Sequence, residues 1–208
     1  MEPSLTDTST HLHRSEAELQ SFLDKLKQGH YNVDLQKLVK EIKRYKEPVL
    51  LSFAPEFDDT TQVWGTKQEK TLIRYEQAWQ YLVKFTQQQH VNNIIWVWCP
   101  TQSSTLVSYY PGSEYVDWLG FKIVNNPVLD EDHQTHSFAA LYQLLHNTVR
   151  LHFSYTIREK PILITRFGSI TPAGKEQEWV REAVSIINER YPEIRGIVLN
   201  PQQAKVIQ

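Results

Sequence analysis

The chain has 208 residues, and this length predicts a single domain. Hydrophobic residues make up 40% of the chain and charged residues 22%, so it can bury a core and is not disordered throughout. The formal net charge of -2 argues against a general binder of nucleic acid or anionic membranes, because such a protein needs a basic face. A single cysteine, Cys99, excludes an intrachain disulfide framework, and no apolar run is long enough to span a membrane.

The N-terminal residues 1–14 are polar and predict a loose tail. They lack the basic and then apolar pattern of a signal peptide, so we expect a cytoplasmic protein, or a fragment of a longer secreted or membrane-linked one. Ser15 and Glu18 form a capping box that opens a helix, and we expect this helix to end near Gly29. A second helical stretch follows, so we predict a tail and then one domain over 15–208.

From residue 48 onward, short apolar runs alternate with helical patterns. The apolar runs lie at 49–54, 93–98, 115–124, 161–165 and 194–199, and the helical patterns at 70–89, at 137–153 and after Thr171-Pro172. This alternation predicts βα units around a mostly parallel sheet. The five units average about 32 residues each, whereas a complete eight-unit barrel needs about 250 residues. We therefore predict an α/β fold, a partial TIM-like (β/α) barrel of about five units with an N-terminal helical segment.

An open barrel has two unpaired edge strands, which are liabilities for aggregation. Here they are the runs at 49–54 and 194–199. We expect the helices of residues 15–45, another chain or a missing segment to cover them.

Four motifs follow one another along the chain. They are Tyr45-Lys46-Glu47-Pro48-Val49-Leu50-Leu51-Ser52-Phe53-Ala54-Pro55-Glu56-Phe57-Asp58-Asp59 with Trp64 after it, Asn93-Ile94-Ile95-Trp96-Val97-Trp98-Cys99-Pro100, Tyr109-Tyr110-Pro111-Gly112-Ser113-Glu114-Tyr115-Val116-Asp117-Trp118-Leu119-Gly120, and Lys160-Pro161-Ile162-Leu163-Ile164-Thr165-Arg166-Phe167-Gly168. In this order they resemble the β-mannanase family of glycoside hydrolases, family 26 of clan A. The motif over 109–120 is the most specific of the four. The resemblance implies the C-terminal five-eighths of a TIM-like barrel, with the family's first three strands absent.

The resemblance also implies positions for the catalytic groups. A retaining glycosidase needs two carboxylates about 5–5.5 Å apart, one as acid/base and one as nucleophile. Glu56 matches the acid/base position, but the nucleophile position holds Arg166, and an arginine cannot attack an anomeric carbon. Pro55 replaces the family's histidine before the acid, and Val124 replaces its supporting tyrosine. These departures predict that the framework is kept and the chemistry lost.

Arg166 has a second reading, as a bidentate ion-pair partner of Glu56. A cation there would keep Glu56 charged, whereas a general acid has to hold a proton. Asp58 and Asp59 are further candidates for such a pair. An inverting mechanism through Asp58 is an alternative without positive support.

Other residues complete the set of candidates. Trp64, Trp98 and Tyr110 are candidate sugar-stacking rings, with Asp58 as a polar contact to substrate, and we expect Trp64 or Trp98, with Tyr110, to be exposed beside Glu56. Trp79, Trp118 and Trp179 are better explained as core. Cys99 follows an apolar strand, so we expect it to be buried and inert. The stretch Asp130-Glu131-Asp132-His133 with His136 has irregular ligand spacing and predicts a solvated loop. We therefore expect no metal and no cofactor.

The sequence therefore predicts a glycoside-hydrolase-like module that is catalytically inactive or impaired and that binds polysaccharide or oligosaccharide. One alternative is an active, retaining endo-glycosidase of the β-mannan type. Another is a structural or interaction domain of a larger glycan-processing protein. Nucleic acid is not an expected partner.

Overall fold

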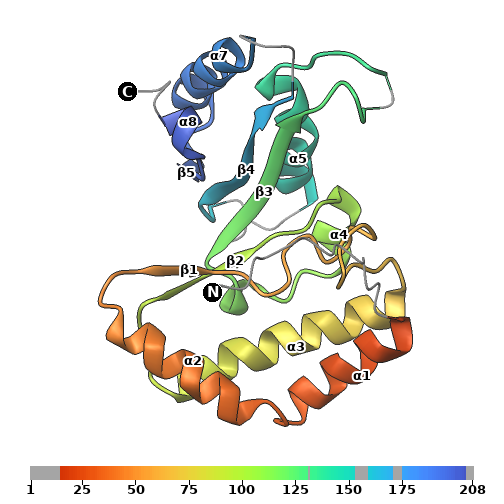
Figure 1. Ribbon diagram of the computed structural model, residues 1–208, viewed down its shortest axis with the longest axis vertical. Coiled ribbons are helices and arrows are strands. Elements are labelled where there is room, and N and C mark those ends of the chain that lie inside the picture. The colour runs from red at the N-terminus through yellow and green to blue at the C-terminus, as the bar shows by residue number, and fades with distance from the viewer. Residues whose placement is uncertain (1–14, 131, 153–158, 171–174, 205–208) are drawn as a thin grey trace, which may run out of the picture.

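The computed structural model describes residues 15–130, 132–152, 159–170 and 175–204. Five parallel strands form one sheet in the order β1-β2-β3-β4-β5, so each strand pairs with the next one along the chain. The N-terminal helices lie below the first two strands, and the later helices lie beside the other three (Figure 1). This is a half-barrel, and the predicted partial TIM-like fold is confirmed. The tail over 1–14 and the cap at Thr171-Pro172 lie outside the described residues.

The elements follow the predicted runs closely. The strands are β1 (Val49–Leu51), β2 (Ile94–Trp98), β3 (Trp118–Asn125), β4 (Ile162–Ser169) and β5 (Ile194–Ile197). The helices are α1 (Glu16–Lys27), α2 (Asn32–Arg44), α3 (Glu69–Gln88), α4 (Ser103–Ser108), the 3-10 turn η1 (Ser113–Tyr115), α5 (Phe138–His152), α7 (Lys175–Arg190) and α8 (Pro201–Ala204). The short α4, η1 and α8 had not been predicted. No helix among the described residues is long and apolar enough to cross a membrane.

Helix α1 begins as predicted. The Ser15 hydroxyl accepts a hydrogen bond from the Glu18 backbone N–H, and the Glu18 carboxylate accepts one from the Ser15 N–H at 2.8 Å. Three leucines of α1 are buried in the main core, and Arg74 of α3 pairs with Asp24 of α1 at 3.0 Å. These contacts dock α1 on α3.

The two faces of the sheet carry different side chains. Trp96 and Trp98 alternate with Val97 and Cys99 along β2, and the two tryptophans pack on the helix side against Trp79 of α3. Val97 and Cys99 instead form a small cluster with Leu163 and Trp118 on the inner face. This inner face corresponds to the inside of a barrel.

Gly120 of β3 lies within the inner cluster. A Cβ atom at this position would lie 2.3 Å from the Cys99 Sγ and 2.9 Å from the Val97 Cγ1. Only glycine therefore fits this close approach of β2 and β3.

The sheet is open at both ends. Within the described part of the chain, no strand pairs with the outer edge of β1 or of β5. Helix α1 packs against α3, and a cavity of about 340 Å³ lies between the apolar side of α2 and Leu51 of β1. What covers the two edges therefore stays a prediction.

Candidate functional site

The loop after β1 has a strained backbone on both sides of Pro55. Ala54 and Glu56 adopt φ angles of 42° and 60°, a region that residues other than glycine rarely enter. The Glu56 N–H donates to the Cys99 carbonyl at 2.7 Å, and the Tyr75 hydroxyl donates to the Phe53 and Ala54 carbonyls. Such strain persists only where neighbouring groups enforce it, and it gathers at functional sites.

Glu56 lies between two cations. Its Oε2 is 3.4 Å from the Lys122 Nζ, and its Oε1 is 3.8 Å from the Arg166 Nη1. The exposed fraction is 11% for the Glu56 side chain, 35% for Lys122 and 60% for Arg166. A single carboxylate thus links the loop after β1 to strands β3 and β4.

The two cations are register partners across the ladder between β3 and β4. Lys122 pairs with Arg166 immediately after a register shift that leaves Thr165 as an extra residue. Phe121, Ile123, Ile164 and Phe167 all belong to the helix-side core, so alternation places Lys122 and Arg166 on the inner face. Lys122 was not among the predicted site residues, although a lysine within an otherwise apolar run was a usable signal.

The expected ion pair between Glu56 and Arg166 is present, but the prediction that it is bidentate is wrong. The structure records one contact, at 3.8 Å, which is longer than the 2.7–2.9 Å typical of a charge-assisted hydrogen bond. The reason is that Lys122 shares the same carboxylate through its second oxygen.

The two aspartates after Glu56 have other partners. Asp58 is buried, and its carboxylate accepts hydrogen bonds from the Thr101 N–H and hydroxyl and from the Gln102 N–H. Its predicted contact with substrate is therefore not available in this geometry. Burial raises the pKa of Asp59, but hydrogen bonds from Thr61 and the charge of Lys122 outweigh this effect and hold the pKa below its usual value.

The three candidate rings differ in exposure. Trp98 is 0% exposed, so the expectation of an exposed ring is wrong there: the side chain points to the helix side and packs against Phe57, Tyr75 and Trp79. Tyr110 is half-buried, and burial raises its pKa to about 12. Trp64 is 38% exposed, and its indole N–H donates to the Pro55 carbonyl at 2.9 Å.

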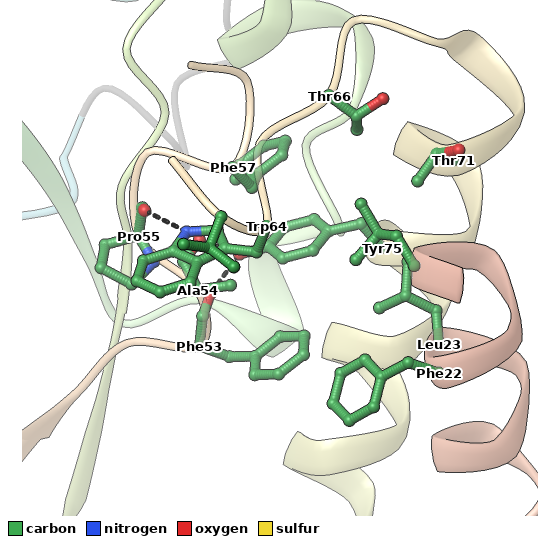
Figure 2. A pocket seen from close by; sticks show the side chains of 12 residues that line it. Phe22, Leu23, Phe53, Ala54, Pro55, Phe57, Trp64, Thr66, Thr71 and Tyr75 are labelled. Carbon is green, nitrogen blue, oxygen red and sulfur yellow. Dashed lines mark hydrogen bonds between the residues drawn. The ribbon is translucent and has the colours of Figure 1, made fainter. Parts of the chain in front are cut away.

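Trp64 lines an apolar pocket of about 450 Å³ between α1, α3 and the loop after β1. Figure 2 shows the rings of Phe22, Phe53 and Tyr75 around this space. Glu56 does not line it. The exposed Trp64 ring and the Glu56 carboxylate therefore face different spaces, contrary to the expectation that they lie side by side.

The remaining predictions concern the core and metal binding. Trp79 and Trp179 are buried, and Trp118 packs on the inner cluster. Cys99 is buried as expected. In the described residues no group of three or more metal-ligating side chains occurs, and Asp132 instead pairs with His136 at 2.8 Å.

A parallel half-barrel with charged side chains on its inner face, beside the loop that follows its first strand, defines part of a (β/α)-barrel protein. The model of glycosyl hydrolase family 26 matches residues 4–198, and the chain belongs to this family.

Two named relatives share less than 30% of their residues with this chain over the matched regions. A beta-1,3-xylanase, TXYA, from Vibrio sp. is 28% identical over 97 residues, which are 44% of this chain and 20% of the xylanase. Endoglucanase H from Acetivibrio thermocellus is 21% identical over 182 residues, which are 83% of this chain and 20% of the endoglucanase. The chain thus spans about a fifth of the length of these curated relatives.

Solved structures show the same fold. GH26C from Muricauda sp. MAR_2010_75 superimposes with a TM-score of 0.66 at 17% identity, over 88% of this chain and 53% of that one. The beta-mannanase BoMan26A from Bacteroides ovatus gives a TM-score of 0.60 at 16% identity, over 91% of this chain and 56% of that one. The half-barrel therefore corresponds to about half of each of these chains.

Proposed function

We propose that this chain is a polysaccharide-binding, glycoside-hydrolase-like module without retaining glycosidase activity. One observation carries the proposal. Arg166 lies on the inner face of β4 with its Nη1 3.8 Å from the Glu56 Oε1, where a retaining mechanism requires a second carboxylate. A guanidinium cannot form the glycosyl-enzyme bond, and its charge opposes an oxocarbenium-like transition state.

The nearby aspartates do not replace the missing nucleophile. The Asp58 carboxylate is buried and bonded to Thr101 and Gln102. Asp59 accepts hydrogen bonds from the Thr61 N–H and hydroxyl at 2.9 and 2.8 Å. Asp58 thus joins the loop after β1 to the loop after β2, and Asp59 serves the loop in which it lies.

Glu56 is also poorly placed to act as an acid. Each of its two oxygens faces a cation, Lys122 on one side and Arg166 on the other. These are the atoms through which a general acid delivers its proton.

Binding of polysaccharide is supported by the family and by Trp64. The relatives are named as a xylanase, an endoglucanase and a mannanase, and all such substrates are polysaccharides. The Trp64 ring is exposed on the loop that also holds Glu56, and an indole face suits the C–H surface of a sugar.

The first experiment measures activity on aryl β-mannosides, aryl β-glucosides, β-mannan and β-1,3-xylan. We expect no turnover by the wild type. Turnover that disappears in Glu56→Gln would overturn the proposal in favour of an active hydrolase.

The second experiment measures oligosaccharide binding by titration calorimetry and tryptophan fluorescence. Trp64→Ala should weaken binding, whereas Tyr45→Ala, which removes an exposed ring on the C-terminal side of α2, should not. A wild type that binds no glycan would refute the binding role and leave an interaction domain.

A further inference from the structure

We propose that Lys122 and Arg166 form a binding site for the carboxylate of an acidic sugar, so that the glycan recognised by this chain contains uronic acid. This inference rests on the proposed function, because it names the class of glycan that the module binds. It concerns the inner face of the sheet and not the apolar pocket beside Trp64.

Two like charges lie side by side on the inner face of the sheet. Lys122 and Arg166 are register partners on neighbouring strands, and both side chains lie on the inner face. Two cations in this arrangement repel each other unless an anion lies between them. Glu56 supplies one carboxylate, but its contacts of 3.4 and 3.8 Å are long for charge-assisted hydrogen bonds.

Few of the hydrogen-bond donors of Lys122 and Arg166 are used within the described residues. A guanidinium carries five N–H donors, and a lysine ammonium carries three. Among the described residues, Arg166 makes only the 3.8 Å contact with Glu56, and 60% of its side chain is exposed. Lys122 makes one 3.4 Å contact with the same carboxylate. Most of these donors therefore face solvent on the inner side of the half-barrel.

The acidic neighbours do not use these donors. The Asp58 oxygens accept hydrogen bonds from Thr101 and Gln102, so this carboxylate is already used by the loop after β2. Asp59 lies within the field of Lys122, but its carboxylate accepts hydrogen bonds from Thr61 and Gln62. Glu56 is the one acidic group that the structure brings into contact with both cations in the described chain.

The donors of the two side chains also have a geometry that suits a carboxylate. A guanidinium presents its N–H groups in a planar fork that matches the two oxygens of a carboxylate, and lysine adds a point charge beside it. Neutral sugars offer only hydroxyl groups to such a site. A uronic acid offers a carboxylate on the ring itself, at the place where a bound sugar would meet Glu56.

The test compares three oligosaccharides of equal length by titration calorimetry: an oligogalacturonate, its methyl ester and a neutral manno-oligosaccharide. The methyl ester keeps the sugar and removes only the charge. We expect the uronate to bind most tightly, with an affinity that falls as salt is raised. Arg166→Gln should weaken uronate binding roughly tenfold or more, because a hydrogen bond between charged groups is lost.

Two further variants separate charge from fold. Lys122→Gln should weaken uronate binding in the same direction, and Arg166→Lys should lie between wild type and Arg166→Gln because it keeps the charge and loses the fork. Arg44→Gln changes an exposed arginine on α2 and serves as the matched control. If Arg166→Gln does not fold, Lys122→Gln and Arg166→Lys still decide the question.

The outcomes distinguish this inference from the proposed function. Equal binding of the uronate and its ester, or uronate binding that Arg166→Gln leaves unchanged, would overturn the acidic-sugar site while the binding role stands. A sulfated oligosaccharide that binds more tightly than the uronate would overturn the assignment to a carboxylate. No binding of any glycan would overturn both proposals.

Discussion

The Asp58 carboxylate accepts hydrogen bonds from both the backbone N–H and the hydroxyl of Thr101, at 2.8 and 2.6 Å. This contact joins the loop after β1 to the loop after β2, because Asp58 follows Glu56 by two residues and Thr101 follows Cys99 by two. The Glu56 N–H bonds to the Cys99 carbonyl in the same region. The strained loop that carries Glu56 is thus fastened to its neighbour at two points.

Replacing Asp58 by alanine should therefore affect stability more than ligand contact. The change leaves the N–H groups of Thr101 and Gln102 without their acceptor in a partly buried site, and we expect a loss of about 1–3 kcal/mol in the free energy of unfolding. Urea denaturation measures it. Asp34→Ala, which removes an exposed carboxylate on α2, is the control and should change stability by less than about 0.5 kcal/mol. A stable Asp58→Ala variant that has lost glycan binding would instead restore the role expected from the sequence.

Gly120→Ala should destabilise the sheet by about 1–3 kcal/mol, because the added methyl group meets the Cys99 Sγ and the Val97 Cγ1. The companion change Cys99→Ala removes the nearest obstructing atom. Thermal unfolding of the two single variants and the double variant forms a thermodynamic cycle, and the double variant should regain part of the lost stability. Strictly additive losses would show that the two side chains do not collide.

Cys99 should be unreactive in the native protein. Burial raises the pKa of its thiol to about 11, and the nearby Glu56 charge acts in the same direction. Only about 0.1% of the thiol is ionised at pH 8, and the thiolate is the reacting form. Ellman's reagent should therefore label native protein slowly and urea-unfolded protein quickly, and the native rate should rise with pH up to the raised pKa. Rapid labelling of the native protein at pH 7 would contradict this burial.

The sequence predicted the positions of the five strands along the chain well, because each strand lies in a short run rich in apolar residues. It placed the end of the first strand at Ala54, whereas β1 ends at Leu51. The difference arises where the chain turns into positive φ at Ala54 and Glu56, which are not glycines and give no local signal. Helix α4 was missed because its six residues, Ser-Ser-Thr-Leu-Val-Ser, show no amphipathic period.

The site was only partly predictable. Glu56 and Arg166 were found through the resemblance, and the structure brings them together. Trp98 was misplaced because alternation along β2 separates Trp96 and Trp98 from Val97 and Cys99 but does not say which pair faces the helices. The choice depends on Trp79 of α3, which lies far away in the sequence and packs on both tryptophans. The pairing of Lys122 with Arg166 depends on the extra residue Thr165, and a register shift of this kind is a tertiary feature.

The open sheet gives the molecule a gradient of local stability. Strand β3 pairs with β2 on one side and with β4 on the other, and its seven register pairs with β4 lie on both sides of the bulge. Strand β1 has three register pairs, all with β2, and β5 has three, all with β4. Backbone groups with a neighbour on one side only open most readily, so exchange of amide hydrogens should begin at β1 and β5 and reach β3 last. Lys122 and Arg166 therefore lie on the pair of strands that opens least, whereas the loop that carries Glu56 begins at a strand that frays.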